Sequence, residues 1–295
     1  MNIFVLMAAL VAAATARSLC PDTQFCDVTN IITSCQSEPW VHESSEILVL
    51  TGVAHLMPFI PKECVTILSA GSITLNNLTL TSSDIKIFAG ITYEEYQQKK
   101  DYYAPGTSES NYKLFILKNS TVSANGFSPL RDNKTIEYGG SYAANGGSSD
   151  NPSTEHFYGH GTFFSNPYVD NYQEQNGAAG YWKTTIGIGG GRIILGSSGD
   201  IEIEGSVTSI GNSFTTMRGN GGSGGYIAID CGREFIVSDA GGTVSVQGGN
   251  GAHGGFGGSG GRIVANIKVA NDRPLGGLFK LGGGNSDNCG KNGEG

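Results

Sequence analysis

Glycine-led strands recur at nearly constant intervals in the second half of the chain, and this repeat restricts the fold more than any other feature. Gly191, Gly225 and Gly261 each precede a short apolar strand, and they lie 34 and then 36 residues apart. Further short strands in each unit are separated by Gly, Ser or Asn. A unit of this kind has one apolar face and can bury it only against its neighbours. The repeat therefore predicts a stacked β-solenoid.

The repeat predicts three strands in a unit, with side chains that alternate between core and solvent. The first strands are expected at 192–195, 226–230 and 262–267, the second at 201–204 and 234–237, and the third at 207–210, 243–247 and 278–281. Less regular coils of the same kind are expected at 72–75, 78–80, 85–88, 114–117 and 120–123. The residues expected to point inward are Ile193, Leu195, Ile201, Ile203, Val207, Ile227, Ile229, Val244 and Val246, with Glu202 and Glu204 facing water.

The 46 glycines among 295 residues need a structural explanation. They follow no G-X-Y register, which excludes collagen. Residues 219–224 (GNGGSG) match the G-x-G-x-x-G fingerprint of dinucleotide-binding loops, but that fingerprint opens a helix, and here the strand-like sequence YIAID follows. We expect the glycines to supply positive φ at the corners of a coil and to allow close approach between neighbouring rungs.

The N-terminus predicts secretion. The apolar run MNIFVLMAALVAA followed by the cleavage pattern Ala14-Thr15-Ala16 is typical of a signal peptide, and no later apolar run approaches the roughly 20 residues of a membrane helix. Six cysteines fit an oxidising compartment. Their spacing leaves the connectivity open, and the simplest arrangement has two bridges in the first group and one between the last pair. The cysteines are Cys20, Cys26, Cys35 and Cys64, followed by Cys231 and Cys289.

Three N-x-S/T sequons agree with secretion and predict glycosylation at Asn77, Asn119 and Asn133. The net charge is −8, only 15% of the residues are charged, and no basic cluster is present. The chain therefore lacks the clustered positive charge that is typical of nucleic-acid-binding proteins.

The sequence divides into a signal peptide at 1–16, a cysteine-containing cap at 17–70 and a glycine-rich solenoid at 71–295. Insertions interrupt the solenoid at about 91–112, where a short helix is expected, and at 139–184. The second insertion is rich in aromatic residues, which build contact surfaces for sugars or proteins. The alternative is a small core packed on the solenoid's flank. The candidate surface residues are Tyr158, Phe163, Phe164, Tyr168, Tyr172, Tyr181 and Trp182.

The sequence contains no recognisable set of catalytic residues. Gly159-His160-Gly161 is similar to the histidine motif of polygalacturonases, but the clustered aspartates that supply acid and base are missing. Asp230, with Arg192 and Arg262 at equivalent positions, suggests a lyase site, but we interpret these three as exposed residues at turn edges. The histidines are dispersed and the glycine runs hold almost no Asp, so no metal, cofactor or catalytic residue is expected.

The glycine-rich turns at this spacing, closed by GGNSDNCGKNGEG, resemble the N-terminal region of large glycine-rich extracellular proteins of plants and protists. The earlier half fits as well, with Leu50-Thr51-Gly52, Met57-Pro58-Phe59-Ile60, Cys64 and the strand at Gly71-Ser72-Ile73. The resemblance implies a β-solenoid and no established enzymatic activity. In that family the glycine-rich region opens a much longer polypeptide, so a chain that stops at Gly295 is expected to be a fragment.

These observations predict an all-β fold: a right-handed parallel β-helix with glycine-rich turns, long loop insertions and a disulfide-containing N-terminal cap. The predicted function is that of a secreted, glycosylated structural or surface protein, without catalysis, in an extracellular coat or fibril. Its partners would be copies of itself or other matrix components. Two alternatives stay open: a carbohydrate-binding or adhesion module that uses the aromatic loop, and a β-helix polysaccharide lyase or hydrolase.

Overall fold

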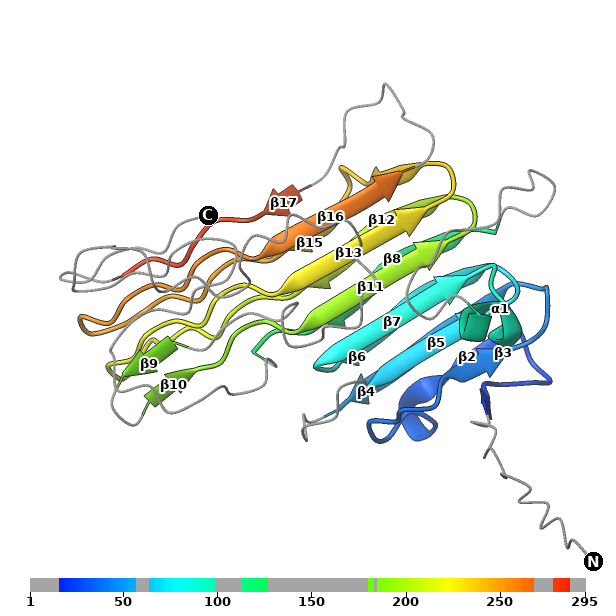
Figure 1. Cartoon of the computed structure of the whole chain (residues 1–295), viewed down its shortest axis with the longest axis horizontal. Helices are drawn as coiled ribbons and strands as arrows, with labels where there is room; N and C mark the ends of the chain where they lie inside the picture. Colours follow the sequence, from blue (N-terminus) through cyan, green and yellow to red (C-terminus); the bar gives the residue numbers. More distant parts are fainter. Residues whose placement is uncertain are drawn as a thin grey trace, which may run out of the picture.

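The computed structural model shows a chain that is almost entirely β, arranged in two parallel sheets (Figure 1). The structure describes residues 16–56, 64–98, 113–126, 180–182, 185–267 and 278–286. Within these ranges, helix is limited to a 3-10 turn (η1, Val28–Asn30) and one short α-helix (α1, Tyr93–Gln98). Helix α1 lies in the first insertion, where the sequence predicts a short helix. The all-β prediction is confirmed.

The chain alternates between the two sheets along most of its length, and neighbouring strands of each sheet run parallel. Sheet A contains, in spatial order, β1 (Arg17–Ser18), β3 (Trp40–His42), β5 (Val65–Ser69), β7 (Asp84–Ala89), β11 (Arg192–Ser197), β13 (Tyr226–Cys231) and β16 (Arg262–Ile267). Sheet B contains β2 (Phe25–Asp27), β4 (Leu48–His55), β6 (Ile73–Thr81), β8 (Phe115–Ser123), β12 (Ile201–Thr208), β15 (Thr243–Ser245) and β17 (Leu278–Lys280), with β14 (Phe235–Val237) also beside β12. A separate antiparallel pair is formed by β9 (Gly180–Trp182) and β10 (Thr185–Gly187).

Two details of the predicted coil differ from the structure. The expected second and third strands of a unit are joined in β6, β8 and β12, because the backbone bends at a single irregular residue and continues pairing. That irregular residue is Asn77, Asn119 or Gly205, and in β4 the register shifts just before Gly52, which pairs with Leu78. The strands that the structure describes do not close into a complete solenoid, so two parallel sheets are the architecture shown.

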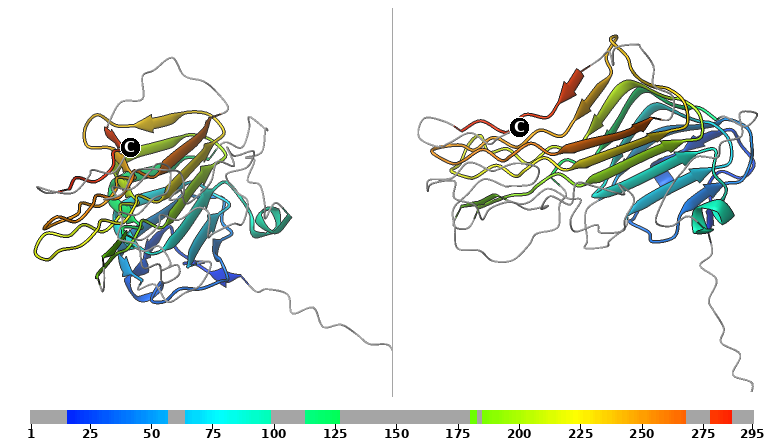
Figure 2. Two further views of the ribbon diagram at one scale, coloured as in Figure 1. Left: turned by 60° about the vertical axis from the view of Figure 1, so that its left-hand side comes forward. Right: turned by 45° about the horizontal axis from the view of Figure 1, so that its top comes forward.

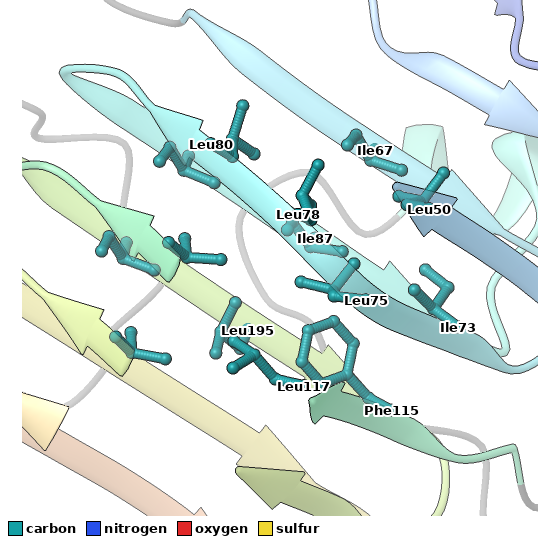
Figure 3. Close-up of a cluster of buried hydrophobic side chains, with 14 of the residues drawn as sticks. Leu50, Ile67, Ile73, Leu75, Leu78, Leu80, Ile87, Phe115, Leu117 and Leu195 are labelled. Carbon is teal, nitrogen blue, oxygen red and sulfur yellow. The ribbon is translucent and has the colours of Figure 1, made fainter. Parts of the chain in front are cut away.

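One apolar core fills the space between the sheets. Alternate residues of facing strands point into it, and Figure 3 shows side chains from both sheets meeting there. All nine residues expected to point inward are buried, with at most 1% of their surface exposed. Glu202 and Glu204 lie on the opposite side of β12 and are partly exposed, as the alternation predicts.

Beyond the apolar core, the two sheets continue as glycine-rich segments that approach each other directly (Figure 2). We call residues 187–191, 209–214, 219–225, 246–251, 255–261 and 282–286 the glycine double layer. Backbone hydrogen bonds cross between its two layers in an unbroken chain. Gly284 donates to Gly258 (2.7 Å), Gly258 to Gly249 (2.9 Å), Gly249 to Gly222 (2.7 Å), Gly222 to Asn212 (3.1 Å) and Asn212 to Ile188 (2.8 Å).

Close approach, rather than positive φ, explains most glycines of this double layer. A methyl group on Gly251 would lie 2.6 Å from backbone atoms of Gly255 and Phe256, well inside any tolerated contact. Positive φ is found elsewhere, at glycines such as Gly52 and Gly90. The prediction of a structural role is confirmed, and β13 follows the GNGGSG run as a strand, but the expectation of positive φ fails for most repeat glycines.

Candidate functional site

The outer face of sheet A carries a buried ion pair. Strand register places Asp84, Arg192 and Tyr226 side by side on three neighbouring strands. The Arg192 guanidinium donates two hydrogen bonds to the Asp84 carboxylate, from Nε at 2.7 Å and from Nη2 at 2.9 Å. Both side chains are 1% exposed. Asp230, on the same face, is 0% exposed, so the interpretation of Arg192 and Asp230 as exposed turn-edge residues is wrong.

The two buried carboxylates that the structure describes on this face, Asp84 and Asp230, are too far apart to act as the pair that glycoside hydrolysis requires. Asp230 is four residues along the strand from Tyr226, and Asp84 lies two strands away from β13. At about 3.3 Å per residue and 4.8 Å per strand, the two carboxylates are about 16 Å apart. Glycosidases hold theirs about 5–9.5 Å apart. Asp84 is also engaged by Arg192, which makes it a structural anion.

Two other buried groups on β13 are held in their neutral forms. Burial raises the pKa of the Tyr226 phenol above its ordinary value, although Arg262 and Arg192 counteract part of this effect. Burial, reinforced by the charge of Asp230, raises the pKa of the Cys231 thiol to about 12. A protonated, buried thiol is a poor nucleophile. Neither group is prepared for nucleophilic chemistry.

The histidines of the described residues lie apart from one another. His42 is buried, and its Nδ1 lies 3.2 Å from the Leu19 carbonyl oxygen, whereas His55 lies beside Thr81 on the outer face of sheet B. Among the described residues, no three His, Cys, Asp or Glu side chains gather closely enough to hold a metal ion. His160 and its flanking glycines lie outside the described residues.

Two disulfides join the N-terminal cysteines. Cys20 is bonded to Cys26, and Cys35 to Cys64, as the simplest arrangement predicts. Cys231 is a free, buried thiol, so the expected bridge from this residue to Cys289 is absent. The reason is the strand alternation, which points Cys231 into the apolar core with the neighbouring isoleucines of β13. Cys289 itself lies outside the described residues.

The sequons at Asn77 and Asn119 sit at matching positions in β6 and β8. Both asparagines are exposed and adopt positive φ, 52° and 47°, at the irregular residue where each strand bends. Gly52, next to the corresponding irregularity in β4, has φ of 96°. Asn is the residue other than Gly that tolerates this conformation best. Backbone geometry therefore explains these two asparagines independently of glycosylation. The third sequon residue, Asn133, lies outside the described residues.

The aromatic insertion is almost wholly outside the described residues, and with it Tyr158, Phe163, Phe164, Tyr168 and Tyr172. Tyr181 and Trp182 belong to β9, whose backbone pairs with β10.

The outer face of sheet B shows a pattern that the sequence analysis missed. In β6, β8 and β12, the two outward residues that follow the bend are Thr or Ser. The two residues of β15 that pair with those of β12 are Thr and Ser as well. The signal is present in the sequence as four Thr/Ser-x-Thr/Ser triplets, TLT, TVS, SVT and TVS. The triplets are hard to recognise as a repeat in the sequence, because insertions of different length separate them. The eight residues are Thr79, Thr81, Thr121, Ser123, Ser206, Thr208, Thr243 and Ser245.

Comparison of the chain with known protein families, curated proteins and solved structures gives no match. No helix within the described part of the chain is long and apolar enough to cross a membrane. The disulfides are typical of proteins that fold in an oxidising compartment.

Proposed function

We propose that this chain is a secreted, glycosylated structural protein of an extracellular coat or fibril. The glycine double layer carries the proposal. It is held by backbone hydrogen bonds that run from rung to rung, and each rung is buried by its neighbours rather than by a side-chain core of its own. Such an architecture extends by adding rungs and suits a load-bearing or filamentous role.

The finer fold in this proposal is a right-handed parallel β-helix. The alternation of the chain between two parallel sheets supports it, and so does the bend that divides β6, β8 and β12 at one register position. Parallel crossover connections are right-handed in about 98% of cases. Secretion rests on the N-terminal sequence and on the two disulfides.

The strand edges supply a route to assembly. Among the described strands, β16 pairs only with β13, and β17 pairs only with β15. The partly buried Ile263, Ile267 and Phe279 extend the core to this end. An unpaired edge backed by apolar side chains accepts a further strand readily. A second copy or another matrix component would supply it.

Electron microscopy of the natively secreted protein tests the proposal. Ordered fibrils or sheets with an axial repeat of about 4.8 Å, the distance between strands, are the expected result. Monomers by light scattering at high concentration would contradict the structural role. Binding of glycans by such monomers, abolished in a Trp182→Ala variant that still folds, would establish the carbohydrate-binding alternative instead.

A further inference from the structure

The eight outward Thr and Ser residues of sheet B form a two-dimensional lattice, which we call the hydroxyl array. Thr79, Thr121, Ser206 and Thr243 make one rank across β6, β8, β12 and β15. The second rank lies two residues further along each strand: Thr81, Ser123, Thr208 and Ser245. Neighbouring hydroxyls are therefore about 4.8 Å apart within a rank and about 6.6 Å apart between ranks.

The hydroxyls of the array are not used to hold the protein together. Thr81 lies 3.2 Å from a nitrogen of His55, and Ser123 accepts a long hydrogen bond from the Asn125 amide, 3.4 Å. The other six make no hydrogen bond within the described chain, and the Ser245 hydroxyl is unpartnered although its side chain is only 1% exposed. By contrast, Ser120 in the same sheet accepts from the Leu78 amide and donates to the Lys118 carbonyl.

Strand propensity alone does not account for this selection. Thr is a good strand former, but Ser is not, and Val, Ile or Tyr would serve an outward strand position equally well. The inward residues between the two ranks are apolar and buried, including Leu80, Val122, Val207 and Val244. The array therefore combines a rigid apolar support with a periodic polar face, on which six residues are partly exposed while Ser123 and Ser245 are buried. Successive strands run nearly parallel (Figure 1), so the periodicity extends over four strands.

The chemistry of the array indicates the kind of partner. Each hydroxyl offers one donor and two acceptor sites, and the array contains no charge and no aromatic ring. The array is bordered by His55 beside Thr81 and by Lys280 beside Ser245, and the Lys118–Glu204 ion pair (3.7 Å) lies before the bend. Soluble ligands usually bind in concave pockets that are lined by aromatic side chains and a few convergent polar groups. A flat, uncharged lattice of donors and acceptors instead matches a partner that is itself periodic.

We propose that the hydroxyl array binds the surface of ice. A crystal of water presents donors and acceptors at fixed intervals, so many individually weak hydrogen bonds form at once. Threonine methyl groups between the hydroxyls restrict where adjacent water can sit, which favours an ordered layer. This inference is independent of the structural role proposed above, because it concerns the face of sheet B and not its edges.

The test measures freezing-point hysteresis and adsorption to a growing ice crystal for the secreted protein. Thr121→Tyr places a ring in the middle of the array, and we expect it to lower both activities at least about tenfold. Thr74→Tyr makes the same change on the same outer face, before the bend, and is expected to leave them unchanged. Circular dichroism and a thermal melt show that both variants fold. The absence of both activities in the unchanged protein, or equal activity in Thr121→Tyr, would overturn the proposal.

N-glycans at the bend would lie beside the first rank of the array, so they are part of the test. The double variant Asn77→Gly/Asn119→Gly removes both sequons and keeps a residue that tolerates positive φ, as Gly52 does in β4. Ice adsorption by the secreted protein itself is the expected result. Adsorption by the double variant alone would show that glycans cover the array, and it would overturn the proposal for the native protein.

Discussion

Replacing a closely packed glycine of the double layer, Gly224, by alanine should destabilise the protein strongly. At Gly224 an added methyl carbon would lie 2.6 Å from both the Gly261 amide nitrogen and the Val246 carbonyl carbon, and closer still to the Val246 oxygen. Contacts below 3.0 Å are essentially never seen, so the two backbones must move apart, and the Val246 oxygen requires the largest shift. The φ of Gly224 is not in the left-handed region, which leaves steric overlap as the cause.

The separation affects two hydrogen bonds at this point. Gly261 donates to the Val246 carbonyl at 2.7 Å, and Gly224 donates to Ser259 at 2.9 Å. Each is worth about 0.5–1.5 kcal/mol, and overpacking typically adds about 1–3 kcal/mol. We therefore expect Gly224→Ala to lower the free energy of unfolding by about 2–6 kcal/mol, measured by urea denaturation.

The matched control is Gly282→Ala. No atom lies within 4 Å of a methyl group built at this position, and the residue is exposed. A surface change of this kind usually alters stability by no more than about 0.5 kcal/mol. Equal denaturation midpoints for Gly224→Ala and the unchanged protein would refute the close-contact explanation of the glycines.

Three further predictions follow from buried groups. Replacing Cys35 and Cys64 by Ala removes a bridge between residues 29 apart in sequence, and chain entropy predicts a loss of about 3–4 kcal/mol in urea denaturation. Arg192→Met leaves the Asp84 carboxylate uncompensated and should cost about 3–5 kcal/mol, whereas Asp84→Leu/Arg192→Met should recover most of it; equal losses would contradict the pairing. Because the Cys231 pKa is raised from 9.0 to about 12 in the folded state, stability should be intact below pH 9 and fall between pH 9 and pH 12; Cys231→Ala should flatten this part of the profile.

The strands and the core could be predicted from the sequence because they depend on local alternation. Ile193, Ile201 and Ile227 occupy alternate positions in short β-branched runs, and all three are fully buried. The burial of Arg192 and Asp230 could not be predicted in this way. Alternation places them correctly on the outer face, but whether an outer face is covered depends on contacts between distant parts of the chain.

The bend in sheet B escaped prediction for a related reason. Asn77 and Asn119 appear in the sequence as sequons, and Gly205 as a turn residue, so nothing local identifies them as one structural column. Only the register of β6, β8 and β12 brings them to the same place. The hydroxyl array has the same origin, since its members are separated by insertions of very different length.

The G-x-G-x-x-G run and the N-x-T sequons have functional meanings in other proteins, but in this chain backbone geometry accounts for both. The G-x-G-x-x-G run at 219–224 leads into β13, and a methyl group at several of its glycines would strike a carbonyl of the facing layer, so close packing selects glycine without a nucleotide. At the bend, positive φ selects Asn or Gly, and the outward strand position two residues later favours Thr, which together produce N-x-T. The second argument covers Thr79 and Thr121 but not the rest of the hydroxyl array: no backbone conformation, internal hydrogen bond or core contact requires Ser206 or Thr243 to carry a hydroxyl. A pattern that the fold does not need is the better guide to what the surface contacts.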